Sequence, residues 1–65
     1  MTRFQEIEVC NLNAGDEFVV SKKLENSYRF EGTSKLNPYE VKCYNMTANK
    51  TEFLPRYAKV YKVIS

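Results

Sequence analysis

The chain has 65 residues, of which 43% are apolar and 28% are charged, and its formal net charge is +2. A chain this short buries only about 60% of the surface that its unfolded form exposes, so we expect one core and a single domain over residues 1–65. Glycine and proline occur only twice each, which excludes a low-complexity or collagen-like chain.

Apolar and polar residues alternate along most of the chain, a pattern typical of half-buried strands. In chain order, the predicted strands are residues 4–10, 17–23, 28–31, 39–46, 51–54 and 57–64. The alternation predicts that the core contains Phe18, Val20, Phe30, Val41 and Cys43. In the last strand two inward sets fit equally, either Val60 with Ile64 or Tyr61 with Val63.

Turn-forming residues separate these strands. Asn11–Asp16 contains the Asn, Gly and Asp residues that favour turns, and Gly32–Pro38 is the longest irregular stretch. Thr47–Lys50 predicts a four-residue hairpin connection. Pro55 is expected to end the fifth strand, and Pro55–Ala58 fits a single turn of 3₁₀ helix.

The pattern predicts an all-β fold. No apolar stripe with a period near 3.6 residues lasts long enough for an amphipathic helix. Five or six short strands laid flat would leave exposed edges, and curling into a barrel is the usual solution. We therefore expect a small five- or six-stranded barrel, either SH3-like or OB-like.

The segment from Leu12 to Phe18, L-N-A-G-D-E-F, resembles the L-x-x-G-D-x-F opening of small SH3-like barrels, including phage and mobile-element proteins. In that family a Gly-Asp turn leads into the first long strand and a V-x-x-V strand closes the barrel, which implies that Val60–Val63 is the closing strand. Such barrels bind peptides, nucleic acids or one another, so the resemblance implies architecture more than function. The chain has no tryptophan, which argues against a polyproline-binding groove.

The composition excludes most catalytic chemistry. Without histidine, the commonest general base and metal ligand are both missing, and no Ser-His or Cys-His pair can form. Cys10 and Cys43 are far apart and are expected to be reduced structural thiols. Glu6 and Glu8 share a face, as carboxylates on a solvated strand commonly do. We expect a protein that is not an enzyme and that uses no cofactor and no metal.

Residues 1–6 lead directly into alternating sequence, without the apolar run of a secretory signal. No stretch approaches the roughly 18 apolar residues that cross a bilayer. These observations predict a cytoplasmic protein that does not act at a membrane.

Charge divides the chain into two halves. Residues 1–32 hold four basic and six acidic side chains, whereas residues 33–65 hold six basic and two acidic ones. Tyrosines interleave with the cations of the second half, an arrangement that can stack bases and neutralise phosphates. The predicted binding residues are Lys42, Tyr44, Arg56, Tyr57, Lys59 and Tyr61. The alternative is that these tyrosines form the barrel rim and the lysines solubilise its edges.

Three classes of function remain open. The first is a small phage-type accessory or inhibitor protein that docks on a host protein through an exposed strand or aromatic patch. The second is a binder of nucleic acid or a small nucleotide, and the third is a structural subunit that forms a homo-oligomer. The slight net charge favours the first class over a nonspecific duplex binder.

Overall fold

The computed structural model of the chain describes residues 3–21 and 26–64. In this part of the chain six strands form one antiparallel sheet, with a single turn of 3₁₀ helix, η1, after the first strand. The elements are β1 (Phe4–Glu8), η1 (Val9–Asn11), β2 (Glu17–Val19), β3 (Tyr28–Thr33), β4 (Glu40–Asn45), β5 (Lys50–Pro55) and β6 (Lys59–Val63). The all-β prediction is confirmed.

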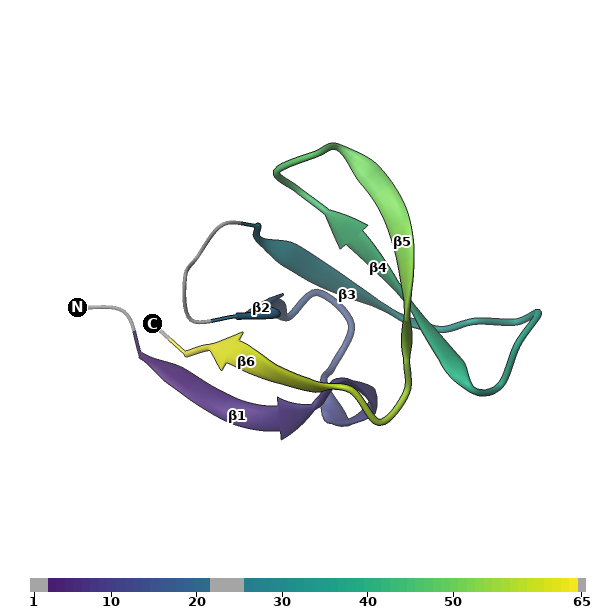
Figure 1. Ribbon diagram of the computed structural model, residues 1–65, viewed down its shortest axis with the longest axis horizontal. Coiled ribbons are helices and arrows are strands. Elements are labelled where there is room, and N and C mark those ends of the chain that lie inside the picture. Colours follow the sequence, from purple (N-terminus) through teal and green to yellow (C-terminus); the bar gives the residue numbers. More distant parts are fainter. Residues whose placement is uncertain (1–2, 22–25, 65) are drawn as a thin grey trace.

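The sheet has the strand order β1-β6-β2-β3-β4-β5 and curls into a half-barrel (Figure 1). Strands β2 to β5 follow one another as antiparallel neighbours. Strand β6 then returns across the sheet and pairs with β1 on one side and with β2 on the other. As a result, β1 and β5 form the two edges of the sheet, and the β3–β4 loop projects from one end (right in Figure 1).

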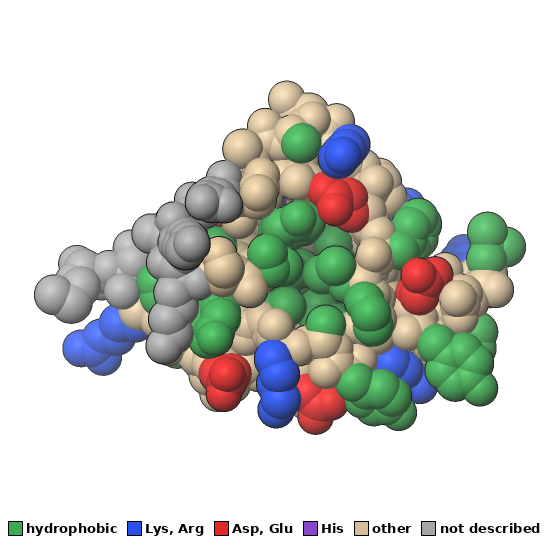
Figure 2. Space-filling view, viewed as in Figure 1, with side chains coloured by type: hydrophobic (Ala, Val, Ile, Leu, Met, Phe, Trp, Pro, Cys, Tyr) green, Lys and Arg blue, Asp and Glu red, His purple; other side chains and the backbone are tan. Residues whose placement is uncertain are grey.

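The inner face of the half-barrel holds the hydrophobic core, part of which is visible in green at the centre of Figure 2. Its buried members come from η1, the segment after it, and four of the strands: Val9, Leu12, Phe18, Tyr28, Phe30, Val41, Cys43 and Val60. The rings of Phe18 and Tyr28 stack with their centroids 5.3 Å apart. Four of the five predicted core residues are therefore confirmed. In the last strand Val60 is buried but Ile64 is 53% exposed, so the first of the two predicted inward sets is confirmed only for Val60.

The prediction that Val20 belongs to the core is wrong. Strand β2 ends at Val19, so the alternation that starts at Phe18 does not extend to Val20, which is 42% exposed. Val19 is buried instead, although it lies outside the core cluster and is paired with Tyr61. Because neighbouring strand residues point to opposite faces, Phe18 faces the core and Val19 faces the outer side of the sheet.

The strand boundaries differ from the predicted ones by a few residues. The first strand ends at Glu8 rather than at residue 10, because the chain turns into η1 there. The second strand is short, and residues 22 and 23, its predicted end, lie outside the described residues. The third extends to Thr33, two residues further than predicted. Tyr39 and Met46 lie just outside β4, and Pro55 is the last residue of β5 instead of following it.

The predicted turns have close counterparts. A four-residue connection, residues 46–49, joins β4 to β5, one residue earlier than expected. After β5, the Ala58 amide donates to the Pro55 carbonyl at 3.0 Å, which closes a single turn where a 3₁₀ turn was predicted. The regular 3₁₀ helix lies at η1 instead.

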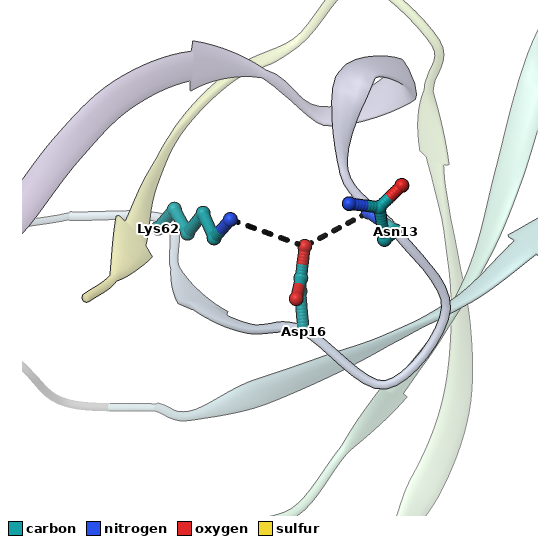
Figure 3. A network of polar contacts seen from close by, with 3 residues as sticks. All are labelled: Asn13, Asp16 and Lys62. Atoms are coloured by element: carbon teal, nitrogen blue, oxygen red, sulfur yellow. Dashed lines mark hydrogen bonds and ion pairs between the residues drawn. The ribbon is translucent and has the colours of Figure 1, made fainter. Parts of the chain in front are cut away.

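The Gly-Asp turn before β2 is fixed by polar contacts to two other strands. The Gly15 amide donates to the Phe30 carbonyl at 2.9 Å, and the Phe30 amide donates to the Asp16 carbonyl at 2.9 Å. The Asp16 carboxylate accepts from the Asn13 amide at 2.8 Å and lies 3.5 Å from the Lys62 ammonium on β6 (Figure 3). Gly15 has a φ of 95°, which favours glycine, so this turn requires both residues of the Gly-Asp pair.

Replacing Phe18 and Val20 separately by alanine tests the assignment of β2. Phe18→Ala should destabilise the protein by about 3–5 kcal/mol, because it removes a fully buried ring. Val20→Ala should change the free energy of unfolding by only about 0.5 kcal/mol, as at other exposed positions. Urea unfolding measures both values, and equal losses at the two positions would contradict the assignment.

Candidate functional site

The structure distributes the predicted binding residues over three places. Lys42 and Tyr44 lie on β4, Arg56 and Tyr57 in the β5–β6 turn, and Lys59 and Tyr61 on β6. Because β3 and β2 lie between β4 and β6, about 14 Å of sheet separates these two strands. The closing strand pairs with β1 and β2, so the β4 and β6 residues do not form one surface.

Two cations of the basic half, Lys59 and Lys62, lie next to carboxylates of the acidic half. Lys59 on β6 lies directly across from Glu8 on β1. Opposite charges at paired positions attract each other. Lys62, a further cation of the basic half, forms the ion pair with Asp16. The folded chain therefore presents no continuous basic surface along β6 and its neighbours, as far as the described residues show.

Tyr44 is packed against its own sheet. The Arg29 guanidinium carbon lies 5.5 Å from the centre of the Tyr44 ring, within the range of a cation–π interaction. The Tyr44 hydroxyl donates to the Asn49 side-chain oxygen at 3.4 Å, and the side chain is half-buried. Stacking a base on Tyr44 would require the ring to leave these contacts.

The β5–β6 turn is anchored on both sides and presents an exposed ring. The Arg56 amide donates to the Tyr39 carbonyl at 2.9 Å, and its carbonyl accepts from the Cys10 amide at 3.1 Å. The Arg56 guanidinium carbon lies 5.1 Å from the centre of the Tyr57 ring. Within the described residues the Arg56 Nε atom is buried and makes no hydrogen bond, so the stacking is what the structure shows holding this side chain. Tyr57 remains 64% exposed.

The β3–β4 loop is ordered by its own hydrogen bonds. The Ser34 hydroxyl oxygen accepts from the amides of Leu36 and Asn37, both at 3.3 Å. The Asn37 side-chain oxygen accepts from the Tyr39 amide at 2.9 Å, and its amide nitrogen donates to the Glu40 carboxylate at 3.1 Å. Side-chain contacts of this kind hold a loop in one conformation. The loop therefore presents Leu36 and Tyr39 in a fixed geometry.

Exposed apolar side chains collect at this end of the half-barrel. We name them the loop-end surface, which consists of Leu36, Tyr39, Phe53 and Tyr57. Leu36 is 96% exposed and Tyr39 is 73% exposed. The backbone hydrogen bond between Tyr39 and Arg56 brings the loop beside the β5–β6 turn, and Figure 2 shows apolar side chains gathered at that end (right).

A cleft of about 410 Å³ opens beside the same loop, and we name it the outer cleft. Its lining residues are Glu31, Thr33, Ser34, Lys35, Leu36, Lys42 and Phe53. Lys42 and Phe53 are paired across β4 and β5, so they share the outer face of the sheet, opposite Val41 and Cys43. The outer cleft joins the loop-end surface to Lys42, one of the predicted binding residues.

Sequence reasoning missed most of this surface. The sequence places Leu36 in a loop without a role, and its alternation puts Tyr39 on the same strand face as the inward residues Val41 and Cys43. The sequence signal for this surface is an apolar residue, Leu36, in a polar loop. Phe53 has no signal of its own, because its exposure follows from the register that pairs it with Lys42 on the outer face.

A polar cluster lies on the inner face at its β4–β5 end, and its side chains hydrogen-bond to one another and to the backbone of the hairpin. The Asn45 side chain, 4% exposed, accepts from the amides of Thr47 and Ala48 and donates to the Glu52 carboxylate at 2.7 Å. Burial, followed by the nearby Glu52 charge, raises the pKa of Tyr28 above its ordinary value. These contacts satisfy the buried amide and hold the β4–β5 hairpin.

Cys43 is not an activated nucleophile. Burial, with the Glu31 and Glu52 charges adding to it, raises the pKa of the Cys43 thiol to about 12. A thiol with a raised pKa stays protonated at neutral pH, whereas the thiolate is the reactive form. Both cysteines are free, as expected. Among the described residues, no group of three or more histidine, cysteine, aspartate or glutamate side chains could hold a metal ion.

Neither a protein-family model, nor a curated protein, nor a solved structure matches this chain. None of the helical structure in the described part of the chain is long and apolar enough to cross a membrane. The candidate site is therefore described by its own geometry.

The raised pKa of Cys43 predicts a loss of stability at alkaline pH. The unfolded chain releases this proton near the ordinary thiol value of 9.0, and the folded chain only near 12. The contribution is thus complete below about pH 9 and is lost as the pH rises toward about 12. Urea unfolding of the parent and of Cys43→Ala at about pH 8 and pH 11 measures it. The parent should lose more stability than the variant over this interval, and equal losses would contradict the assignment.

Proposed function

We propose that this protein is a non-enzymatic module that docks on another protein through the loop-end surface. The observation that carries the proposal is the nearly complete exposure of Leu36 on a loop that internal hydrogen bonds hold in place. Exposed apolar side chains that cluster on an ordered surface are typical of binding sites. Because the loop is already ordered, binding would cost little conformational entropy.

The strand arrangement supports an SH3-like barrel over the OB-like alternative as the scaffold. Strands β2 to β5 form a meander, and β6 returns to pair with β2 after a short turn. The Gly-Asp turn precedes β2 and the V-x-x-V residues lie in β6, although β2 has only three residues and is not the long strand that the resemblance implies. In this interpretation β1 is an additional strand on the outer side of β6. The phage-type role as an accessory or inhibitor of a host protein rests on the resemblance alone.

The distribution of charge disfavours the nucleic-acid alternative. A phosphate backbone needs a continuous track of cations with accessible aromatic rings. Lys59 and Lys62 lie beside carboxylates, and Tyr44 is engaged by Arg29 and Asn49. The third class, a structural homo-oligomer, would use the same apolar side chains, so a second copy of the chain is an outcome that the partner experiment must separate.

Substitutions on the loop-end surface should remove partner binding. The tagged parent is compared with the tagged Leu36→Asp and Tyr57→Ala variants for the partner proteins that each retains, and these partners are quantified by mass spectrometry. Each variant should reduce retention of the same partner by at least about 30-fold, as loss of an interface anchor does. Both side chains are largely exposed, so the fold should be unaffected.

Lys50→Glu is the matched control for this experiment, because Lys50 is exposed and begins β5 next to the β4–β5 connection, away from the β3–β4 loop. Thermal unfolding establishes that all variants are folded. Equal retention by the parent and both loop-end variants would refute the proposal. If the only retained protein that decreases is a second copy of this chain, the homo-oligomer replaces docking on another protein as the function.

A direct measurement distinguishes the nucleic-acid alternative. Fluorescence anisotropy with a labelled 20-nucleotide poly-dT strand should give a dissociation constant above about 10⁻⁴ M at physiological salt, which is weaker than the usual nonspecific binding. Tight binding that weakens steeply as salt rises, and that Tyr44→Ala reduces, would instead support a phosphate ligand.

A further inference from the structure

The outer cleft has the size and walls of a site for one large apolar side chain. Its volume of about 410 Å³ lies at the lower end of the range for binding pockets. Leu36 and Phe53 form apolar walls, and both remain largely exposed, at 96% and 50%. An apolar group that entered the cleft would remove surface from water on both sides.

The charges around the cleft select the sign of its occupant. Lys35 and Lys42 line it together with Glu31. Within residues 3–21 and 26–64 neither lysine forms an ion pair. An incoming carboxylate would therefore meet two attractive charges and one repulsive charge, whereas an incoming cation would meet one attractive charge and two repulsive ones.

The walls of the cleft are held before anything binds. Ser34 fixes the amides of Leu36 and Asn37 on one wall. The other wall belongs to β5, whose residues are paired with β4 along its length. Between the lining residues Glu31 and Thr33, the register between β3 and β4 shifts at Gly32, which lies across from Lys42 and has a φ of 128°. A Cβ atom at this glycine would meet nothing within 4 Å, so the space above it is open.

From this combination we infer that the partner presents an acidic segment whose apolar side chain enters the outer cleft, with flanking carboxylates next to Lys35 and Lys42. The inference rests on the proposed function, because it describes the segment that a docking partner offers to the loop-end surface. It assigns the outer cleft to the apolar anchor and its two lysines to the choice of partner.

Two matched peptides test the inference by NMR titration of the ¹⁵N-labelled full-length protein. One peptide carries a leucine and a phenylalanine between pairs of aspartates, and the other has lysines in place of the aspartates. The acidic peptide should shift the amide signals of residues 33–36, Lys42 and Phe53, and the basic peptide should bind at least about tenfold more weakly.

Three variants locate the effect. Leu36→Ala should weaken binding of the acidic peptide by about tenfold, because it removes an apolar wall of the cleft. Lys42→Glu should abolish the preference for the acidic over the basic peptide. Lys50→Glu removes an exposed cation on β5 that does not line the cleft and should retain the preference. Equal binding of the two peptides, shifts that map elsewhere, no binding of the acidic peptide, or peptide-independent shifts that grow with protein concentration would each overturn the inference.

Failure of the inference is distinguishable from failure of the proposed function. If the peptides do not distinguish charge at the cleft but Leu36→Asp still loses its partner, docking stands and the acidic partner is wrong. If the loop-end variants retain every partner, the docking function itself is wrong.

Discussion

The position of β6 is the constraint on which the rest of the structure depends. This last strand lies between β1 and β2, so strands from the two ends of the chain pair with each other at one edge of the sheet. Val60 on β6 contributes to the core, and Lys62 reaches the Gly-Asp turn that precedes β2. The β6 pairing therefore joins the N-terminal strand to the β2–β5 meander. It depends on contacts between residues that are distant in sequence, which form slowly during folding.

The same return of the chain builds the candidate surface. To reach β2 from the edge strand β5, the chain must turn sharply, and residues 56–58 form that turn. Two backbone contacts fix it, one to Tyr39 beside β4 and one to Cys10 in η1. Tyr57 is exposed because the turn lies at the end of the half-barrel, where the strands stop covering one another. Closure of the sheet and exposure of the aromatic end thus have one cause.

Order without burial distinguishes the β3–β4 loop from an ordinary connection. Loops usually lie on the surface with polar side chains in water. Here the polar side chains Ser34 and Asn37 bond to the backbone of their own loop. The apolar Leu36 is left facing solvent. The polar side chains of this loop are therefore engaged with the loop itself, and its apolar side chain is the one in contact with water.

The all-β class, the approximate strands and most of the core follow from the amino-acid sequence, because the two-residue alternation of a strand can be recognised in consecutive residues alone. Phe18, Phe30, Val41 and Cys43 follow from that period, whereas Val20 does not, since nothing local marks the end of β2. Long-range pairing in the folded chain set which side chains meet. It placed Lys59 opposite Glu8 and Lys62 beside Asp16, so two cations of the basic half lie next to carboxylates of the acidic half. It also made β5 an edge and left Phe53 and Leu36 exposed beside one cleft, because strand order is set by long-range pairing that no local pattern encodes.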